Sequence, residues 1–288
     1  MRRRAHLPRT MLACLAWLLA AAAALGAYAD ERAPLTLRVL TYNIHGLPAW
    51  IARDDPEARI GRLLPLTRTF DVVLLQEDFA YQAVVDALHG RHHAVRAEPA
   101  GGTPFLRQGT GLTLLTDIPP QGAAHATAYG ACHGWLSASS DCLADKGTLA
   151  QRLRVRDGLQ VDVWNTHLDA GRSDDDHAAR VAQLAVLAAD IERHSAGRAV
   201  ILGGDFNLHW TVPRDQALLL AFAKRLGLAL AARVPDDGGR KRVDYLLYRA
   251  APGVPLRVRG AGVAPGFTDA QGEPLSDHPP VFAEFDLR

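Results

Sequence analysis

The sequence predicts an α/β fold built as one domain, and three observations support this prediction. Short apolar runs typical of buried strands alternate with segments of helical periodicity, without a convincing linker between them. Several apolar runs end in a carboxylate, an amide or an imidazole, and open α/β sheets hold their ligands at such ends. The 288 residues, 48% hydrophobic and 22% charged, have the composition of an ordinary globular protein.

The beginning of the chain is predicted to be a targeting segment. Four arginines precede an uncharged run, Met11 to Leu25, and the small-residue sequence Ala27-Tyr28-Ala29 follows it. A basic head, an apolar centre and an A-x-A site are typical of a secretory signal peptide. We therefore expect cleavage after Ala29, with residues 30–288 forming the mature domain in a secreted or periplasmic location. Because the apolar run is short for a membrane span, an uncleaved anchor is the alternative.

Removal of this segment would change the charge of the protein. The segment carries four of the 32 basic side chains and no acid, so 28 bases would face 31 acids and the net charge would fall from +1 to −3. This balance gives no general basic field for nucleic acid. It argues only weakly against a nuclease, because a local basic groove would not appear in the total.

Two cysteines, Cys132 and Cys142, lie outside the targeting segment. An even pair in an exported chain favours a disulfide. The sequence between them lacks the C-x-x-C or H-x-x-x-H spacing of zinc sites. We therefore expect these cysteines to be joined.

The first half of the chain contains three predicted strands and two predicted helices. Apolar runs and alternation place strands at residues 35–42, 71–76 and 111–116, and helical spacing places helices near residues 60–67, with a bend at Pro65, and 84–88. Residues 91–110 contain several glycines and prolines and are predicted to form a loop. Residues 118–146 are rich in glycine, alanine and serine and are predicted to be a surface excursion that holds the cysteine pair.

The second half continues the same alternation. Strands are predicted at residues 159–167, 199–202, 242–248 and 281–285, and a helix near residues 215–226. Another helix is expected to begin at Ser173, where a serine with an aspartate three residues later forms a capping-box sequence. Its buried face is predicted from the helical spacing of Val181, Leu184, Leu187 and Ile191.

Residues 201–207 carry the strongest chemical signal. An apolar run ends there in two glycines, a carboxylate (Asp205) and, two residues later, an amide (Asn207). Both side chains offer oxygens, which suit a hard cation, and an amide can also contact a phosphate. Alone, this pattern is equally typical of an Asx turn that ends a strand.

Polar side chains also stand at the edges of the other predicted strands: Asn43, Glu77, His167, Asp244 and Asp277 with His278. Taken singly, each has an ordinary structural explanation. Glu77 can be a solvated acid, and His167 can be bonded to the backbone. Asp244 can pair with Arg240 or Arg242, and Asp277 can be a turn residue before two prolines. Their common position at strand ends and their order along the chain favour a shared site.

That order resembles the endonuclease/exonuclease/phosphatase superfamily, which includes deoxyribonuclease-I-like nucleases, neutral sphingomyelinases and inositol-polyphosphate phosphatases. The matching motifs, in order, are T-Y-N-I-H-G with Asn43, L-L-Q-E with Glu77, G-D-F-N with Asp205 and Asn207, V-D-Y with Asp244, and S-D-H with Asp277 and His278. The resemblance extends over residues 35–285. It implies a four-layer α/β/β/α sandwich, with two mixed β-sheets face to face and helices outside.

The resemblance also implies roles for these residues. Glu77 would ligate Mg²⁺ or Mn²⁺, with Asn43 and Asp277 nearby, because oxygen donors favour these ions over zinc. Asp205 would orient or deprotonate the attacking water, and Asn207 and His167 would contact the phosphate. His278 would be the active-site histidine, as a base or as a stabiliser of charge, and Asp244 would fix its tautomer.

The expected activity is that of an exported, metal-dependent phosphodiesterase acting on a phosphoester, either a phospholipid head group or nucleic acid. The sequences T-Y-N-I-H-G-L-P and L-L-Q-E-D-F-A-Y resemble sphingomyelinase-like members more than nucleases. His45 stands where abasic-site nucleases of the superfamily carry an acid, and the T-H-L element around His167 is absent from those nucleases. Trp135 is the only loop candidate for membrane contact. No protein partner is implied, and we expect a monomer.

Two alternatives stay open. In an extracytoplasmic nuclease, a groove for phosphates would be lined by residues 91–93, Arg107 and residues 240–242. In a non-catalytic binding domain the fold would persist without chemistry. Such relatives normally lose the asparagine, the glutamate or the terminal histidine, and this chain keeps all three.

Overall fold

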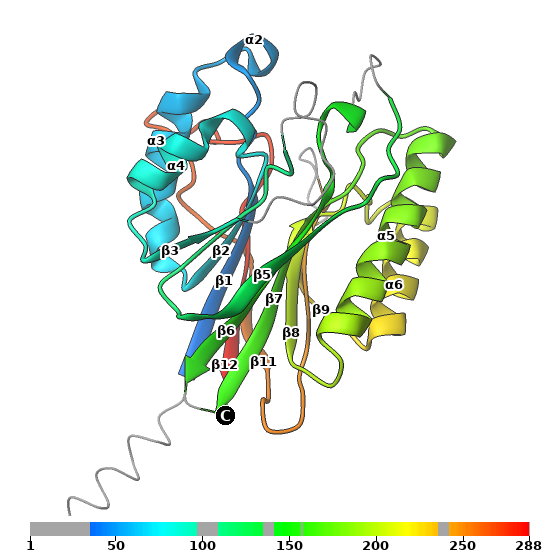
Figure 1. Ribbon diagram of the computed structural model, residues 1–288. Coiled ribbons are helices and arrows are strands. Elements are labelled where there is room, and N and C mark those ends of the chain that lie inside the picture. Colours follow the sequence, from blue (N-terminus) through cyan, green and yellow to red (C-terminus); the bar gives the residue numbers. More distant parts are fainter. Residues whose placement is uncertain (1–34, 97–108, 135–140, 157, 236–241, 288) are drawn as a thin grey trace, which may run out of the picture. The chain divides into compact units, whose positions relative to one another are not determined.

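Two six-stranded β-sheets form the centre of the fold in the computed structural model (Figure 1). The structure describes residues 35–96, 109–134, 141–156, 158–235 and 242–287, and the fold lies within one unit of the chain, Thr36–Leu287. The first sheet has the order β11-β12-β1-β2-β4-β3 and the second the order β5-β6-β7-β8-β10-β9. Each sheet is mixed, because β1 runs parallel to β2 and β7 runs parallel to β8, whereas β4 and β10 are antiparallel to their neighbours.

The bounds of the strands are as follows. The first sheet consists of β1 (Leu35–Asn43), β2 (Val72–Gln76), β3 (His93–Val95), β4 (Thr113–Thr116), β11 (Arg257–Val263) and β12 (Val281–Leu287). The second consists of β5 (Pro120–Ala128), β6 (Gly147–Arg156), β7 (Leu159–His167), β8 (Val200–Asp205), β9 (Ala229–Arg233) and β10 (Asp244–Arg249).

Helices cover the outer face of each sheet (Figure 1). The first sheet is covered by α3 (Pro56–Leu66) and α4 (Gln82–Leu88), and the second by α5 (Asp174–His194) and α6 (Pro213–Leu226). The short helices are α2 (Ala49–Ala52), η1 (Thr67–Thr69), η2 (Phe79–Tyr81) and η3 (Asp141–Leu143). The predicted four-layer sandwich is thus confirmed. Within the residues that the structure describes, none of the helices has the length and apolar character needed to span a membrane.

The capping box predicted at Ser173 begins α5. The hydroxyl of Ser173 accepts a hydrogen bond from the amide of Asp176 (3.1 Å), and the amide of Ser173 donates to the Asp176 carboxylate (2.8 Å). These bonds satisfy two amides that the first helical turn would otherwise leave unpaired. Leu184, Leu187 and Ile191 are buried as predicted, but the prediction for Val181 was wrong, because its side chain is 44% exposed.

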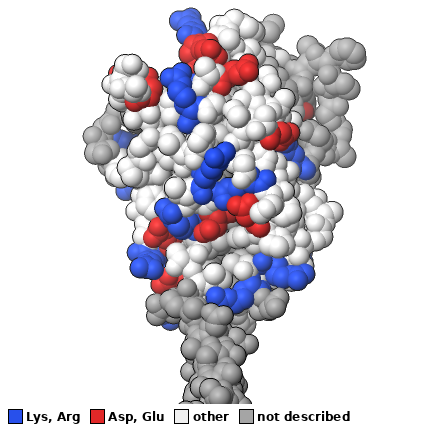
Figure 2. Space-filling model, turned by 90° about the vertical axis from the view of Figure 1, so that its left-hand side faces the viewer, with Lys and Arg blue, Asp and Glu red and all other residues white. Residues whose placement is uncertain are grey.

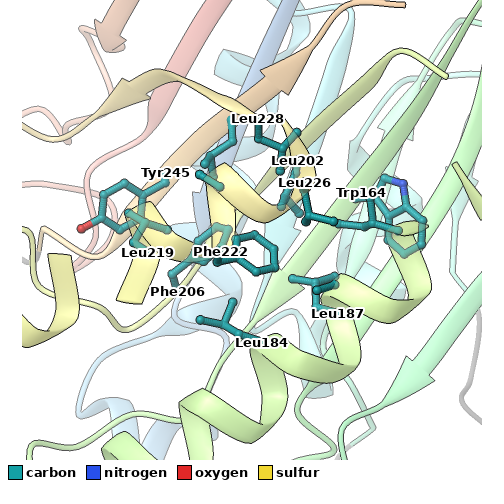
Figure 3. Close-up of a cluster of buried hydrophobic side chains, with 14 of the residues drawn as sticks. Trp164, Leu184, Leu187, Leu202, Phe206, Leu219, Phe222, Leu226, Leu228 and Tyr245 are labelled. Carbon is teal, nitrogen blue, oxygen red and sulfur yellow. The ribbon is translucent and has the colours of Figure 1, made fainter. Parts of the chain in front are cut away.

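A separate apolar core fills each space between helices and sheet. The larger one joins α5 and α6 to the second sheet, and Figure 3 shows Phe222 and Leu226 of α6 facing Leu202 and Phe206, with Trp164 at one end. The other core joins α3 and α4 to the first sheet through Ile60, Leu63 and Leu64. Burial of a Leu or Phe side chain contributes about 1.5–3 kcal/mol, so these two layers hold the helices on the sheets.

The two sheets meet through a polar contact as well as through apolar side chains. The amide of Gln76, at the end of β2, donates to the side-chain oxygen of Asn165 in β7 (2.7 Å), and the Asn165 amide donates to the carbonyls of Leu75 (2.8 Å) and Thr113 (3.2 Å). Gly203 lies in the same layer, where a Cβ atom would meet Leu74 and Leu246 side chains at 2.7 and 2.8 Å. The sheets are therefore held close together and in one register.

The surface excursion predicted over residues 118–146 is wrong in part. Residues 120–128 form strand β5, which pairs with β6 at the edge of the second sheet. Strands β6, β9 and β11 were not predicted, and β3 lies in the expected loop 91–110. These strands have partly exposed faces, so their sequences lack the continuous apolar runs that identify a buried strand.

The cysteine prediction is confirmed, because a disulfide joins Cys132 to Cys142. Other predicted features fall outside the described residues. These are the targeting segment 1–29, Trp135, and the basic residues Arg107, Arg240 and Lys241.

The contact between the sheets generates a stability prediction. Asn165→Ala removes one of the three acceptors of the Gln76 amide and the side-chain donor to two buried carbonyls, so we expect the free energy of unfolding to fall by about 2–4 kcal/mol. Urea unfolding followed by circular dichroism measures the loss. Gln271→Ala, at an exposed loop position, serves as the control and is expected to change stability by less than about 0.5 kcal/mol. Equal stability of the two variants would contradict the structural role of this contact.

Candidate active site

The candidate site residues come together because the strands that carry them end at the same edge of the two sheets. Asn43 ends β1, and Glu77 follows β2, its parallel neighbour. His167 ends β7 and lies opposite Asp205, the last residue of β8. Asp244 begins the antiparallel strand β10 and is also opposite Asp205 in register. His278 arrives from the loop that leads into β12.

Asp205 lies at the centre of this group. Its Oδ2 accepts a hydrogen bond from the Asn43 amide (3.1 Å) and lies 3.4 Å from His167 Nε2 and 3.6 Å from His278 Nε2. Its Oδ1 accepts from the backbone amide of Asn207 (2.9 Å). The side chain is almost completely buried. One carboxylate therefore joins residues from both sheets.

Glu77 brings a second carboxylate to the group. Its Oε1 accepts from the Asn43 amide (2.9 Å) and lies 3.8 Å from His167 Nε2. Its Oε2 is buried and accepts no hydrogen bond from the described residues, and His45 Nδ1 lies 3.7 Å away. Glu77, His167 and Asp205 each offer one donor atom within 4.8 Å of the others. A buried carboxylate oxygen that accepts no hydrogen bond fits a site for a divalent cation, because a buried negative charge needs a positive charge beside it.

His278 is held by Asp244. The Nδ1 atom of the ring lies 2.9 and 3.1 Å from the two Asp244 oxygens, and both residues are buried. Because a carboxylate can only accept, Nδ1 carries the proton and donates it to Asp244. This leaves Nε2 as the ring atom that faces Asp205 and the remainder of the site.

Lys146 is a member of the site that sequence reasoning missed. Its ammonium lies 2.6 Å from His167 Nε2, and its side chain is buried. Lys146 directly precedes β6, and Gly147 at the start of β6 pairs with His167. Recognition of β6 as the neighbour of β7 would have pointed to this lysine.

Burial and charge act in opposite directions on the two carboxylates. Desolvation would raise the pKa of Glu77, but His167, Lys146, the hydrogen bond from Asn43 and His278 together lower its pKa. Desolvation likewise opposes ionisation of Asp205, and His278, His167 and Lys146 outweigh it, so the pKa of Asp205 is lowered. Both groups are thus anionic at neutral pH, which is the form that binds a cation.

The backbone of the site adopts conformations that side chains other than glycine rarely take. His45, Glu77 and Asn207 have φ values of 50°, 60° and 48°. Each such residue costs free energy unless its surroundings fix it, and such residues concentrate at functional sites. Gly46 permits a close approach of two backbone segments, because a Cβ atom there would lie 2.2 Å from the Glu77 carbonyl oxygen. The Gly46 amide donates to that carbonyl instead (2.8 Å).

Arg59 and Ser276 hold the loops that carry the site. The buried guanidinium of Arg59 donates to the carbonyls of Ile44 (2.6 Å), His45 (2.7 Å) and Leu275 (3.1 Å). The hydroxyl of Ser276 donates to the Asn43 carbonyl (2.7 Å). These bonds tie the segment before β12 to the end of β1. Arg59 lies in the middle of α3, and nothing in its local sequence distinguishes it from a surface arginine.

Seven of the eight predicted site residues contact one another at this edge of the sheets. They are Asn43, Glu77, His167, Asp205, Asn207, Asp244 and His278. Asn43 turns its amide nitrogen, not its oxygen, toward Glu77 and Asp205. The Asn207 side-chain amide donates to the Leu168 carbonyl (2.9 Å), so it braces the loop after β7. Asp277 lies at the rim, is exposed, and has Oδ1 3.4 Å from His45 Nδ1. The predicted roles of these residues as ligands, base or phosphate contacts stay predictions.

Comparison with known sequences identifies relatives of this chain. A sequence model of the Endonuclease/Exonuclease/phosphatase family matches residues 40–278. A sphingomyelinase of Mycobacterium tuberculosis is 33% identical over 273 residues, which cover 86% of this chain and 52% of the mycobacterial protein. The chain thus spans about half the length of that relative.

Solved structures share the fold. Sphingomyelinase C from Streptomyces griseocarneus is 20% identical and superposes with a TM-score of 0.66 over 87% of this chain and 99% of its own. A mutant beta toxin from Staphylococcus aureus, whose structure contains bound magnesium ions, is 15% identical, with a TM-score of 0.66 over 86% and 99%. At these identities the similarity establishes the fold.

The unpaired oxygen of Glu77 generates a binding prediction. We expect Glu77→Gln to weaken Mn²⁺ binding at least about tenfold, or about 1.4 kcal/mol, because the variant removes an anionic oxygen from the site. Titration with Mn²⁺ followed by electron paramagnetic resonance measures the change. Glu273→Gln removes an exposed carboxylate and is the matched control. Unchanged Mn²⁺ affinity in Glu77→Gln would exclude this residue as a ligand.

Proposed function

The chain belongs to the endonuclease/exonuclease/phosphatase family, and we propose that it is an Mg²⁺-dependent phosphodiesterase that cleaves sphingomyelin-type lipids. One observation carries the proposal. The two carboxylates Glu77 and Asp205 share a buried group with Lys146, His167 and His278, so a cation site and donors for a phosphoryl group lie side by side. This is the combination that hydrolysis of a phosphodiester requires.

Glu77 and Asp205 would hold the ion, with Asn43 orienting both carboxylates. A bound Mg²⁺ would neutralise charge on the phosphoryl oxygens and help to position the attacking water. Carboxylate oxygens favour Mg²⁺ or Mn²⁺ over softer metals, and the ion bound in the beta toxin structure is magnesium. We propose that Asp277, at the rim of the site, would also lie near the bound ion.

Asp205 is proposed to orient the water that attacks phosphorus. The surrounding positive charge lowers the pKa of Asp205 and makes it a weak base, which favours orientation of the water over its deprotonation. Nε2 of His278 faces Asp205 and is placed to exchange a proton with the reacting groups. Asp244 holds the ring through Nδ1, so the reactive nitrogen keeps one direction during the reaction.

Charge that develops on the phosphoryl oxygens needs donors that are already in position. We assign this role to Lys146 and His167, which lie 2.6 Å apart between the two sheets. Buried donors of this kind act more strongly than exposed ones, because little water competes with them. Asn207 would contribute from the adjacent loop, where its backbone amide already fixes Asp205.

The lipid substrate is proposed on the similarity to sphingomyelinases and on the distribution of charge. On the face shown in Figure 2, Lys and Arg side chains alternate with Asp and Glu side chains. Arg91, one of the residues expected to line a nucleic-acid groove, instead donates to the Thr67 carbonyl (3.0 Å) and to Asp117 (2.7 Å). Its side chain is 7% exposed, so it supports the fold and is not available to phosphates.

We also propose that residues 1–29 direct export and are removed. This follows from the basic head, apolar run and A-x-A site of the sequence, and the Cys132–Cys142 disulfide agrees with an oxidising compartment. Mass spectrometry of the protein exported from a bacterial host should give Asp30 as the first residue. Retention of residues 1–29 in the exported protein would favour the anchor instead.

A substrate panel tests the proposed function. Purified protein is incubated with sphingomyelin vesicles, bis-p-nitrophenyl phosphate and plasmid DNA, each with Mg²⁺ and with EDTA. We expect Mg²⁺-dependent release of phosphocholine and loss of activity in EDTA. Nicking of the plasmid without phosphocholine release would identify a nuclease. Absence of EDTA-sensitive turnover on all three substrates would favour a non-catalytic binding domain.

Single substitutions test the roles of Asp205 and His278. We expect Asp205→Asn and His278→Ala each to lower kcat about 10²–10⁴-fold, because each removes a group that acts on the reacting atoms. Circular dichroism and the melting temperature show whether the variants fold. His92→Ala is the matched control, since the His92 side chain is 81% exposed and lies away from the site. Near-wild-type turnover in folded Asp205→Asn and His278→Ala would refute both assignments.

A further inference from the structure

A second group of metal-binding side chains lies on the opposite face of the second sheet. It consists of His125 in β5 and of Asp190 and His194 in α5. One donor atom from each lies within 4.8 Å of the others. None of the three residues belongs to the candidate active site, and none was predicted from the sequence as a site residue.

The two helical residues have the spacing of a metal-binding pair. Asp190 and His194 are four residues apart, so their side chains leave α5 on the same face, one turn apart. His194 is the last residue of α5, and Ser195 caps the helix, its backbone amide donating to the Ile191 carbonyl. The hydroxyl of Ser195 accepts from the Trp164 indole (3.1 Å) and donates to Asp162 (2.8 Å). These bonds tie the end of α5, which carries Asp190 and His194, to strand β7.

His125 is directed to this pair by an irregularity in β5. Between Gln121 and His125 the strand gains two residues relative to its partner β6, where Arg152 and Ala150 are the paired residues. Bulges of this kind redirect side chains and are frequent beside functional sites. The ring of His125 lies over the ring of His194, with centroids 3.9 Å apart and planes inclined by 32°.

One of the three separations equals that between two ligands of a tetrahedral ion, and the exposed ring of His194 would have to turn away from His125 for both imidazoles to bind the same ion. His125 Nε2 lies 3.3 Å from Asp190 Oδ2. Two ligands of a tetrahedral Zn²⁺ with bonds of roughly 2.0–2.1 Å are separated by roughly 3.3 Å. The other Asp190 oxygen, Oδ1, lies 3.7 Å from the exposed guanidinium of Arg193.

A cavity of about 230 Å³ adjoins the group. Gln121 and Gly122 of the bulge line it, together with Trp164, His125 and His194. Zinc sites with three protein ligands keep a fourth position for water or an exogenous ligand, and this cavity has room for it.

We propose that His125, Asp190 and His194 form a binding site for a transition-metal dication, Zn²⁺, separate from the catalytic cation site. Two imidazoles and one carboxylate favour Zn²⁺ over Mg²⁺, which binds through oxygen. The ion would join the edge strand β5 to the end of α5. It would therefore stabilise the edge of the sheet, where β5 has a neighbouring strand on one side only.

The position of this group separates it from the candidate active site. His125 pairs with Ala150, and Ala150 pairs with Trp164, so His125 lies two strands across and three residues along from His167. Strand geometry makes this roughly 14 Å. Trp164 faces the helices, whereas His167 contacts Glu77 of the other sheet, so the two groups occupy opposite faces.

Zinc binding to the full protein tests the proposal. Equilibrium dialysis against Zn²⁺ in excess Mg²⁺ gives the number of bound ions, and the melting temperature is measured with and without Zn²⁺. We expect His125→Ala/His194→Ala to bind one Zn²⁺ fewer than the wild type. At a hundredfold excess over Kd, Zn²⁺ should raise the wild-type melting temperature by roughly 5–10 °C, and this rise should vanish in the double variant.

The control variant is His92→Ala/His93→Ala, which removes another neighbouring histidine pair beside an aspartate, Asp117. It should bind as many Zn²⁺ ions as the wild type. If the double variant at the proposed site fails to fold, His194→Gln replaces it, because His194 is exposed and tolerates substitution. That variant should bind Zn²⁺ at least about tenfold more weakly.

Hydrogen exchange gives a second readout that does not depend on activity. Zn²⁺ should slow amide exchange in residues 120–128 of the wild type and leave it unchanged in the variants at the proposed site. Equal Zn²⁺ stoichiometry and an equal rise in melting temperature in the wild type and in His125→Ala/His194→Ala would overturn the proposal. Neither result depends on whether the protein hydrolyses a phosphodiester.

Discussion

The buried contact between Gln76 and Asn165 is the constraint on which the candidate site depends. It joins β2 of one sheet to β7 of the other, one residue before Glu77 and two residues before His167. Gly203 of β8, two residues before Asp205, also packs against the first sheet, because a Cβ atom there would meet the side chain of Leu74 at 2.7 Å. Sliding of one sheet on the other would break the bond between Gln76 and Asn165 and the two bonds that the Asn165 amide donates to Leu75 and Thr113 of the first sheet. The relative position of the two sheets therefore sets the distances among the carboxylates and imidazoles at their edge.

The ionisable groups of the site form one connected cluster and not a set of independent pairs. Three carboxylates, Glu77, Asp205 and Asp244, face Lys146 and two histidines in a mostly buried space. Burial of such groups costs free energy that their mutual attraction only partly offsets, so the cluster is weak evidence for stability. Positive φ values at His45, Glu77 and Asn207 add to this cost. An arrangement that is unfavourable for folding is expected where side chains must be held for binding or chemistry.

Much of this site was accessible from the sequence, because Asn43, Glu77, His167 and Asp205 end or directly follow strands that are buried along most of their length. Such strands have continuous apolar runs, as in residues 71–76, and the polar residue after each run is conspicuous. Lys146 was not accessible, because it precedes β6, where the polar residues Thr148, Gln151 and Arg152 interrupt the apolar pattern. Arg59 was missed for a different reason. Its three bonds reach carbonyls of two distant loops, and only the tertiary structure brings those loops beside α3.

Strand β7 separates two kinds of donor set, and this separation has a chemical consequence. On its inner side, at the carboxyl end, His167 accompanies the carboxylates Glu77 and Asp205, so oxygen donors prevail. On its outer side, Trp164 lies beside His125, where two imidazoles and one carboxylate prevail. Mg²⁺ binds imidazole poorly, and Zn²⁺ binds it well, so the two sets discriminate between ions by ligand type. The protein would thereby keep a hard ion for phosphate chemistry and use a softer ion to stabilise the edge of its second sheet.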